Sequence, residues 1–489
     1  MEEKRLSDLA AKYFPYILTG IFLLSLFLRW KYFNINSAVW YDEGSYLAQA
    51  RLWGFDLSLE DNYYFRRTFF LPILWAGLYK IGLGELSLHF TELVFSFVAV
   101  VYTYLLGKFW FNKYVGAIAA FVLGTSWLHL FFTSRLLTDV PALAFIIPGI
   151  YYFLKGYPEK PKLMYLAAIL ISLSIFTRLG YFITVVPILV YIITKEKLKF
   201  LKNKHLWIML IIFLIILTPF FIKFFSYEGA NEGVKGSLIH YFTGREILIF
   251  DYIKNLNYIY QGTFIFLAAF GLTYFTELFL GLDIIFKNEK IRRKLFMLVW
   301  ILMPIIIFGL VTAVVEERYL MLTLPMFALL IGYASEKISS VSDRLFKSKI
   351  FGVVIVLLLL GFGGYSQVVF ADELIVSKRD TFIHLKFAGE WIKENSEPTD
   401  RIISSGQPQL LYYSDRNIDS YTSTAEQFPE KINLLKPKYM LITRWEPSPD
   451  WTYSWPQENQ DKVKPVKAWY FDEAQTQPAV IIYEFVNTN

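Results

Sequence analysis

The chain has 489 residues, of which 55% are hydrophobic, 19% aromatic and only 18% charged. Its mean hydropathy of +0.41 and its several apolar runs of about 20 residues are typical of a multi-pass membrane protein. The sequence contains no cysteine, which excludes disulfides, thiolate catalysis and cysteine-zinc sites. The net charge of +6 does not indicate a nucleic-acid partner, because the basic residues lie mainly in short loops between apolar segments.

Lysine and arginine are distributed unevenly between the polar segments. Six short segments contain 22 Lys or Arg in 57 residues, whereas the intervening polar segments contain 10 in 98. Because Lys and Arg gather in cytoplasmic loops, we assign the first set to the cytoplasm and the second set to the outer side. The six basic segments are 1–12, 108–113, 155–162, 195–204, 287–294 and 337–349.

This assignment predicts eleven membrane-spanning helices, with the N-terminus in the cytoplasm and the C-terminus outside. The first apolar segment, Tyr13–Phe33, lacks a small-residue cleavage site and is too long for a signal-peptide core, so we expect it to be retained. Residues 163–194 begin and end in Lys-rich segments and are therefore expected to cross twice, with a hinge at Thr177–Gly180. The other spans are expected at Leu86–Gly107, Tyr114–Thr133, Val140–Leu154, Leu206–Phe224, Ile259–Phe286, Leu295–Val315, Tyr319–Glu336 and Ile350–Phe370.

Two long outer loops are expected, at 34–85 and 225–258. Within the first, the apolar segment Phe69–Leu83 would be about 22 Å long as a helix, which is too short to span the bilayer. We predict a juxtamembrane helix there, preceded by an amphipathic helix over Glu43–Trp53. The second loop is rich in Gly and Tyr, and it carries Lys235, His240 and Arg245.

The composition changes sharply after the last span. Residues 372–489 contain 9 of the 19 prolines and no apolar run long enough to cross a membrane. We therefore expect 1–371 to form a membrane domain and 372–489 to form a small α/β domain on the outer side. A helix is predicted at Thr381–Glu394. Strands are predicted at Arg401–Ser404, Tyr439–Thr443, Val466–Phe471 and Ala479–Phe485.

Charged side chains gather at the predicted outer ends of the spans. Charges at membrane level usually face a cavity and pair with a partner. Carboxylates together with several arginines suit a phosphate-bearing substrate, because a guanidinium fork matches phosphate oxygens. The polar residues of this set are Asp42, Glu43, Arg66, Arg67, Arg135, Asp139, Arg178, Lys235, His240, Arg245, Glu316, Glu317 and Arg318.

For several of these residues, a purely structural role is an alternative to a role in substrate binding or catalysis. Arg66 and Arg67 are long enough to snorkel at the membrane interface. Asp139 lies where a helix is expected to begin, and an acidic residue there stabilises the helix dipole. Arg318 beside a tyrosine is typical of an interfacial anchor, and Arg178 is placed to bridge two helix ends.

Four short motifs occur in order along the chain. Residues 40–44 read Trp-Tyr-Asp-Glu-Gly, directly after the first span. Arg67 precedes a Leu-Pro-Ile-Leu run at 71–74, which opens the juxtamembrane segment. The sequence Ser-Arg-Leu-Leu-Thr-Asp-Val-Pro occupies 134–141, directly after the third span. A late Glu-Arg-Tyr-Leu-Met-Leu-Thr-Leu-Pro sequence at 317–325 opens another span.

With these four motifs in this order, each near the predicted outer end of a membrane segment, residues 13–336 resemble the GT-C glycosyltransferases that use a polyprenyl-phosphate sugar. That group includes the protein O-mannosyltransferases and the aminoarabinose transferases of lipid A. The chain departs from the lipid A branch, which commonly has Lys-Pro where this sequence has Arg67-Thr68. It also departs from the eukaryotic branch, because 225–258 is too short for a β-trefoil domain. The acceptor is therefore left open: protein, glycan or lipid.

The resemblance implies roles for individual residues. Asp42 corresponds to the catalytic base or acceptor-orienting acid, with Glu43 beside it, and Asp139 corresponds to a second acid. Arg67 and Arg318 correspond to residues that bind the donor phosphate. Further candidates for phosphate binding are Arg66, Arg135 and Arg245.

The expected activity is transfer of a sugar from a polyprenyl- or dolichyl-phosphate donor at the outer face of the cytoplasmic membrane, with inversion at the anomeric carbon. No P-loop or Gly-rich dinucleotide motif is found, in agreement with a donor that arrives through the membrane. No metal site is expected, although a divalent ion near Asp42, Glu43 and His240 is left open. The alternatives are a transporter or flippase for a lipid-linked or anionic solute, and a membrane-anchored scaffold. Neither an internal repeat nor mid-bilayer charge supports a transporter.

Overall fold

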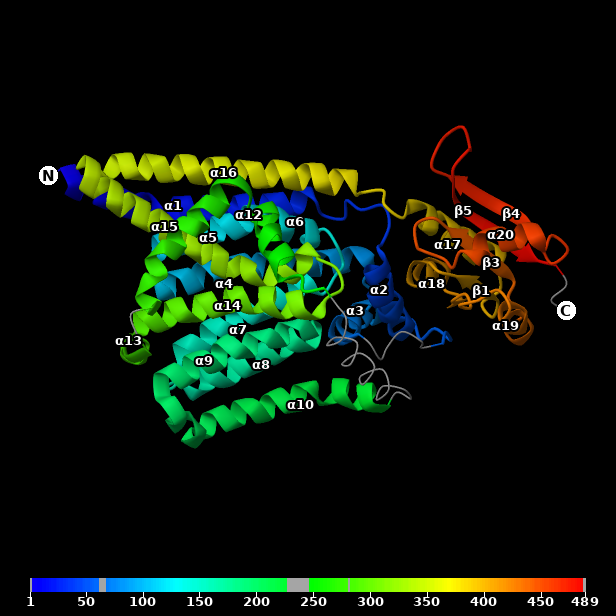
Figure 1. Ribbon diagram of the computed structural model, residues 1–489, viewed down its shortest axis with the longest axis horizontal. Coiled ribbons are helices and arrows are strands. Elements are labelled where there is room, and N and C mark those ends of the chain that lie inside the picture. Colours follow the sequence, from blue (N-terminus) through cyan, green and yellow to red (C-terminus); the bar gives the residue numbers. More distant parts are fainter. Residues whose placement is uncertain (1, 61–66, 227–245, 280–281, 487–489) are drawn as a thin grey trace. The chain divides into compact units, whose positions relative to one another are not determined.

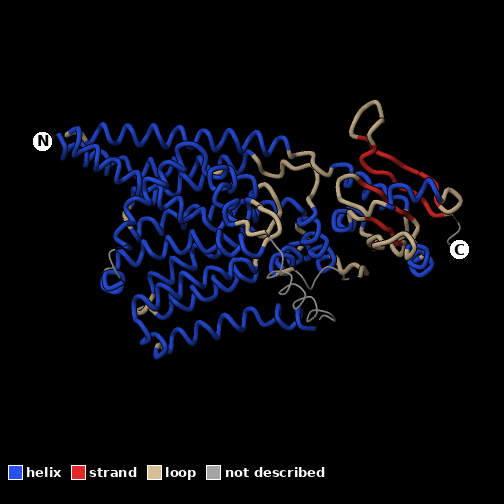
Figure 2. Tube along the Cα trace, viewed as in Figure 1, coloured by secondary structure: helices blue, strands red, loops and turns tan. Residues whose placement is uncertain are grey.

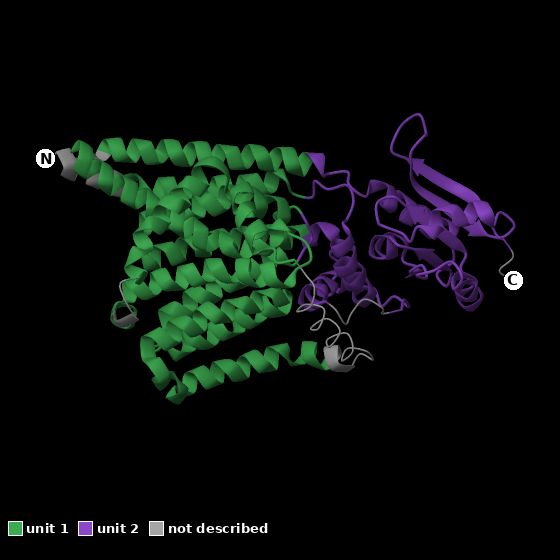
Figure 3. Ribbon diagram, viewed as in Figure 1, with its two compact units in different colours: residues 1–33, 89–134, 138–376 green, residues 34–88, 135–137, 377–489 purple. Residues whose placement is uncertain are grey.

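The structure, a computed structural model, describes residues 2–60, 67–226, 246–279 and 282–486. The chain divides into two compact units (Figure 3). Residues 1–33, 89–134 and 138–376 form the first, which we call the helical unit. Residues 34–88, 135–137 and 377–489 form the second, which we call the mixed unit.

The helical unit consists of long apolar helices that run roughly along the horizontal of Figure 1. Its α-helices are α1 (Glu2–Lys31), α4 (Glu85–Trp110), α5 (Lys113–Thr125), α6 (Trp127–Thr133), α7 (Asp139–Gly156), α8 (Pro161–Thr177), α9 (Val185–Glu196), α10 (Lys204–Ser226), α12 (Ile249–Leu272), α13 (Leu282–Lys287), α14 (Glu289–Val311), α15 (Leu324–Phe346) and α16 (Lys349–Ser377). Four short 3₁₀ segments continue or connect them: η2 (Leu179–Thr184), η3 (Lys197–Lys202), η4 (Thr273–Phe279) and η5 (Glu317–Thr323).

The expected multi-pass helical architecture is confirmed. Among the described residues, eight helices are long and apolar enough to cross a membrane, and the bent pair α5 and α6 makes a ninth. The axes of this pair differ by 55°. The two remaining expected spans correspond to α7, of 18 residues, and α8, of 17 residues, which lie at the lower limit for crossing a bilayer.

The expected second outer loop is shorter than predicted, because α12 begins at Ile249 rather than at Ile259. Tyr252 is fully buried, and its hydroxyl lies 2.9 Å from Thr312 Oγ1, so packing beside α14 holds these first turns helical. Gln261 and Gly262, both with positive φ, break α12 near its middle, and glycine tolerates that conformation. The expected loop residues 227–245 lie outside the described part of the chain.

The mixed unit contains a five-stranded sheet of order β2-β1-β3-β5-β4. Its strands are drawn in red in Figure 2. The strand β1 pairs in parallel with β2 and β3, whereas β5 is antiparallel to β3 and β4. The strands are β1 (Arg401–Ser404), β2 (Asn417–Asp419), β3 (Tyr439–Thr443), β4 (Val463–Tyr470) and β5 (Pro478–Phe485). The helices are α2 (Tyr41–Gly54), α3 (Phe70–Lys80), α17 (Ile383–Asn395), α18 (Gln407–Ser414), α19 (Phe428–Leu435) and α20 (Trp451–Glu458).

A helix is present where the amphipathic helix over Glu43–Trp53 was expected, but its expected polar face is not exposed. Every residue from Glu43 to Ala50 is buried, so the helix has no solvent face along most of its length. Two glycines allow its neighbours to come close: a Cβ on Gly44 would lie 2.9 Å from the backbone nitrogen of Gln409, and a Cβ on Gly54 would lie 2.7 Å from Tyr79 Cβ. The helix is therefore clamped between α3 and α18 within the mixed unit.

Candidate active site

The two acidic residues of the 40–44 motif lie in the first turn of α2, with Trp40 at the N-cap. Glu43 accepts a hydrogen bond from the backbone N–H of Trp40 at 2.6 Å, which is one half of a capping box. Adjacent helical residues point about 100° apart, because the helix has 3.6 residues per turn. Asp42 and Glu43 consequently face different surroundings.

Glu43 is buried and committed to structural contacts. Its Oε1 accepts a hydrogen bond from the backbone N–H of Leu136 at 2.8 Å, and its Oε2 lies 3.5 Å from Nη1 of Arg135. Burial raises the pKa of the Glu43 carboxyl, and the nearby Arg135 guanidinium opposes that shift. Glu43 therefore holds the short segment 135–137 against α2.

Arg135 is equally buried, with no exposed surface. Its guanidinium lies 4.2 Å from the centroid of the Trp40 ring, and its Nη2 donates to the backbone carbonyl of Lys378 at 3.0 Å. A guanidinium held in this way supports the start of α2. Its surroundings differ from those expected for a residue that meets a lipid phosphate.

Asp42 points away from this buried cluster and pairs with Arg67. Oδ1 of Asp42 lies 2.7 Å from Nη2 of Arg67, and the two side chains are 27% and 29% exposed. The Arg67 guanidinium also lies 5.4 Å from the centroid of the Tyr46 ring. A small surface cleft adjoins this pair, lined in part by Tyr46, Gln49 and Arg67. An accessible carboxylate thus lies beside an accessible guanidinium.

A further carboxylate, Glu446, lies near Asp42 and was not predicted from the sequence. Its Oε1 accepts a hydrogen bond from Nε2 of Gln409 at 2.9 Å. Burial raises the pKa of Glu446, and the negative charge of Asp42 adds to that rise. Glu446 belongs to the loop after β3, which no motif connects to the first turn of α2.

The helical unit brings together a second set of expected residues. Asp139 is fully buried in the first turn of α7, and its Oδ2 lies 3.0 Å from Nη1 of Arg178. The Arg178 guanidinium lies 5.6 Å from the ring centroid of Tyr319, the neighbour of Arg318. Arg318 itself forms an ion pair with Glu316. Asp139, Arg178 and Arg318 therefore gather near the starts of α7, η2 and η5.

Glu317 is the first residue of η5, and four other expected residues cannot be placed. Arg66, Lys235, His240 and Arg245 lie outside the described residues. Within the described ranges, no group of three or more His, Asp or Glu side chains is arranged to hold a metal ion.

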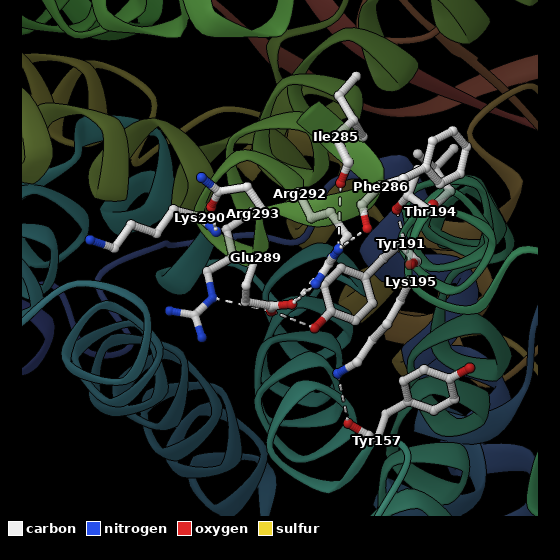
Figure 4. A network of polar contacts seen from close by, with 12 residues as sticks. Tyr157, Tyr191, Thr194, Lys195, Ile285, Phe286, Glu289, Lys290, Arg292 and Arg293 are labelled. Atoms are coloured by element: carbon white, nitrogen blue, oxygen red, sulfur yellow. Dashed lines mark hydrogen bonds and ion pairs between the residues drawn. The ribbon is translucent and has the colours of Figure 1, made fainter. Parts of the chain in front are cut away.

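The basic segments expected in the cytoplasm contain a different kind of charge cluster, centred on Glu289 of α14 (Figure 4). The Glu289 carboxylate accepts a hydrogen bond from the Tyr191 hydroxyl at 2.7 Å, and lies 2.7 Å from Arg292 Nη2 and 3.4 Å from Arg293 Nε. Lys195 donates to the backbone carbonyl of Tyr157 at 3.3 Å. The Tyr191 contact ties α9 to α14, and the Lys195 contact ties α9 to Tyr157, the C-cap residue of α7.

Comparison with known proteins agrees with the expected resemblance. The family model described as dolichyl-phosphate-mannose-protein mannosyltransferase matches residues 67–222. This segment includes Arg67, Asp139 and Arg178. No match was found among curated protein sequences.

Solved structures of similar fold cover nearly the whole chain. ArnT from Cupriavidus metallidurans, bound to undecaprenyl phosphate, has a TM-score of 0.64 at 12% identity over 95% of this chain and 97% of that one. The oligosaccharyltransferase AglB from Archaeoglobus fulgidus, in complex with an inhibitory peptide and a dolichol-phosphate, has a TM-score of 0.62 at 13% identity, with coverages of 98% and 74%. The arabinofuranosyltransferase AftD from Mycobacteria has a TM-score of 0.54 at 11% identity, with coverages of 96% and 40%. The chain therefore has the GT-C fold, as the sequence predicted.

Proposed function

We propose that this chain is a membrane glycosyltransferase that moves a sugar from a polyprenyl- or dolichyl-phosphate donor to an acceptor, with inversion at the anomeric carbon. The observation that carries the proposal is the accessible pair of Asp42 and Arg67 at the start of α2, in a chain of GT-C fold. The similar structures of ArnT and AglB contain undecaprenyl phosphate and dolichol-phosphate, which supports a lipid phosphate as the donor's carrier.

Asp42 acts as the general base. The acceptor oxygen attacks the anomeric carbon while its proton passes to the Asp42 carboxylate, and the bond between that carbon and the phosphate oxygen breaks. The lipid phosphate leaves with the bonding electrons. Attack from the face opposite the phosphate inverts the anomeric centre, and a positioned base of this kind contributes about 10²–10⁴-fold in rate.

Arg67 binds the donor phosphate by exchanging part of its contact with Asp42 for phosphate oxygens. A guanidinium carries five N–H donors, so it can keep one carboxylate contact while it meets a phosphate. Donors aimed at the departing phosphate stabilise charge that grows in the transition state. Arg318 is assigned to the same phosphate, and Arg66 and Arg245 are assigned to the donor as well.

Other expected residues have structural roles in this proposal. Glu43 and Arg135 fix the first turn of α2, and Asp139 with Arg178 fixes the start of α7. No step of this mechanism uses a metal ion.

The chain is placed in the cytoplasmic membrane with its N-terminus inside and residues 372–489 outside. The concentration of Lys and Arg in the six segments assigned to the cytoplasm supports this orientation. It leaves Asp42, Asp139 and Arg318 on the outer side, where a lipid-linked donor presents its sugar.

The direct test uses purified protein in proteoliposomes with a polyprenyl-phosphate sugar as donor. A transferase cleaves the bond between sugar and phosphate, so mass spectrometry should detect sugar-free polyprenyl phosphate. A transporter or flippase moves the donor between leaflets and leaves it covalently intact. Intact donor after prolonged incubation with folded protein would contradict the proposal.

A further inference from the structure

The loop between β3 and α20 lies against the start of α2. Trp445 in this loop packs its ring 5.2 Å from that of Phe382, centroid to centroid, and Phe382 in turn lies 6.5 Å from the ring of Trp40. Trp40 is the N-cap residue of α2, two positions before Asp42. This chain of aromatic contacts holds Glu446, the next residue in the loop, at the same end of α2.

Helix α18 also contacts the start of α2. A Cβ on Gly44 would lie 2.9 Å from both the backbone nitrogen of Gln409 and the carbonyl carbon of Pro408, so α18 sits directly on the first turn of α2. Gln409 is fully buried, and its Nε2 donates to Glu446 at 2.9 Å. Residues from α2, α18 and the loop after β3 therefore form one cluster.

Two side chains of this cluster, Glu446 and Gln409, offer hydrogen-bond acceptors to a ligand. Oε1 of the Gln409 amide is buried without a hydrogen-bond partner among the described residues. Glu446 forms no ion pair within those residues either, although it lies near the like charge of Asp42. A buried amide oxygen without a donor is costly, and it is stabilised once a ligand supplies one.

We propose that Glu446 and Gln409 bind the acceptor, and that the acceptor is a saccharide. This inference rests on the proposed function. One acceptor hydroxyl gives its proton to Asp42, while neighbouring hydroxyls of the same sugar donate to Glu446 and to Oε1 of Gln409. A sugar carries several hydroxyl donors on adjacent carbons, whereas a serine or threonine side chain offers one. Glu446 is thus a residue that positions the acceptor, and it takes no part in proton transfer at the reacting oxygen.

The test compares Glu446→Gln with wild type, using a polyprenyl-phosphate sugar as donor and hexyl glycosides as probe acceptors. Loss of a charged hydrogen bond to the acceptor should raise the acceptor KM by about tenfold or more. The donor KM and the slow transfer of sugar to water should change by less than about twofold, because neither uses the acceptor site. Glu473→Gln, an exposed glutamate in the same domain, is the matched control and should leave all three unchanged.

Gln409→Leu provides a second variant of similar volume that removes the amide, and it should also raise the acceptor KM without changing the donor KM. An unchanged acceptor KM in active Glu446→Gln protein would overturn the inference and leave the proposed function intact. Wild-type protein that transfers sugar to a threonine-containing peptide but to no hexyl glycoside would overturn the saccharide assignment. Wild-type protein that releases no sugar from any lipid-phosphate donor would contradict the proposed function and, with it, this inference.

Discussion

Asp42 and Glu43 are adjacent in sequence but have different surroundings. Both follow the first span, and both are candidates for catalysis when only the sequence is known. The structure buries Glu43 against Arg135 and the backbone of residues 40 and 136, whereas Asp42 keeps about a quarter of its surface exposed beside Arg67. A catalytic base must reach its substrate, so the geometry favours Asp42 for chemistry and Glu43 for positioning.

The acceptor site should depend on pH through Glu446. Its carboxyl faces Tyr41 and Asp42 of α2 and Gln409 of α18, with Arg67 beside Asp42. Burial and the charge of Asp42 raise its pKa, so it takes up a proton at a higher pH than an ordinary carboxyl does. The protonated form is a poorer acceptor of hydrogen bonds. The acceptor KM of the wild type should therefore rise as the pH falls through this raised pKa.

Steady-state kinetics at a series of pH values checks this prediction. In Glu446→Gln the acceptor KM should already be high and should stay constant over the same range, while the donor KM follows the wild type. A wild-type acceptor KM that does not change as the pH is lowered would show that Glu446 does not meet the acceptor in its ionised form.

Sequence patterns reveal only some residues of this site. Asp42, Arg67 and Asp139 lie in local motifs at the ends of predicted helices, where a charge stands out against apolar surroundings. Glu446 and Gln409 lie in the part of the chain after the last apolar segment, where polar residues are ordinary. Gln409 reaches the site because Gly44 lets α18 approach α2, and Gln409 in turn donates a hydrogen bond to Glu446. Contacts between residues so far apart along the chain leave no local pattern.

The elements of the mixed unit are linked by ion pairs. Arg51 of α2 makes a two-point contact with Asp415 at the end of α18, at 2.7 and 3.1 Å. Arg401 of β1 binds Glu60 at 2.5 and 2.9 Å. These contacts join residues 34–88 to residues 377–489 within the mixed unit, so that the two segments stabilise each other.

Asp415→Asn should loosen this connection. The substitution keeps the positive φ that Asn tolerates, but it removes the charge that partners Arg51. Both side chains are mostly buried, so the loss should cost about 1–3 kcal/mol of folding free energy. The melting temperature in detergent should fall by several degrees, whereas that of the exposed control Asp461→Asn should not change. Equal melting temperatures for the two variants would mean that the ion pair is not needed to hold α2 and α18 together.

Some elements of the mixed unit can be predicted from their own residues, whereas others depend on contacts with distant parts of the chain. Strands β1 and β3 were predicted at the residues where they occur, because each is a short apolar run between polar turns. Strand β2, Asn417–Asp419, was missed, since Asn and Asp are depleted in strands and only its pairing with β1 makes it one. The buried position of α2 was missed for a related reason: its mixture of small and polar residues resembles a surface helix until α3 and α18 cover it.

At the scale of the whole molecule, the prediction to test is that one donor phosphate binds both Arg67 and Arg318. Arg67 belongs to the mixed unit and Arg318 to the helical unit. Because both are assigned to one donor phosphate, they are predicted to approach each other in the folded protein. The chain has no native cysteine, so Arg67→Cys combined with Arg318→Cys offers a specific test with a short bismaleimide.

A cross-link between these two cysteines should form in high yield, whereas Lys199→Cys paired with Arg318→Cys should form none, because Lys199 lies in a segment assigned to the opposite side of the membrane. Absence of the first cross-link, with both thiols shown to be reactive, would separate the two arginines and leave Arg318 as an interfacial anchor.

The proposed orientation can be checked in the same cysteine-free background. Glu473→Cys lies in the C-terminal domain and should react with a membrane-impermeant maleimide in intact cells. Lys199→Cys lies in a basic segment assigned to the cytoplasm and should react only after the cells are permeabilised. The reverse labelling pattern would mean that the number of spans was miscounted by one, most simply at α3 or around α8 and α9.

The most direct test of the central claim is the rate of sugar transfer from a polyprenyl-phosphate donor by Asp42→Asn, compared with wild type and Asp56→Asn. Asn keeps the shape of Asp but cannot accept the acceptor's proton, so turnover should fall by about 10²-fold or more. Binding of the lipid phosphate should persist, because arginines hold it. Asp56, which is 81% exposed in the same segment, serves as the matched control, and its variant should transfer sugar normally. Near-normal transfer by well-folded Asp42→Asn protein would contradict the account.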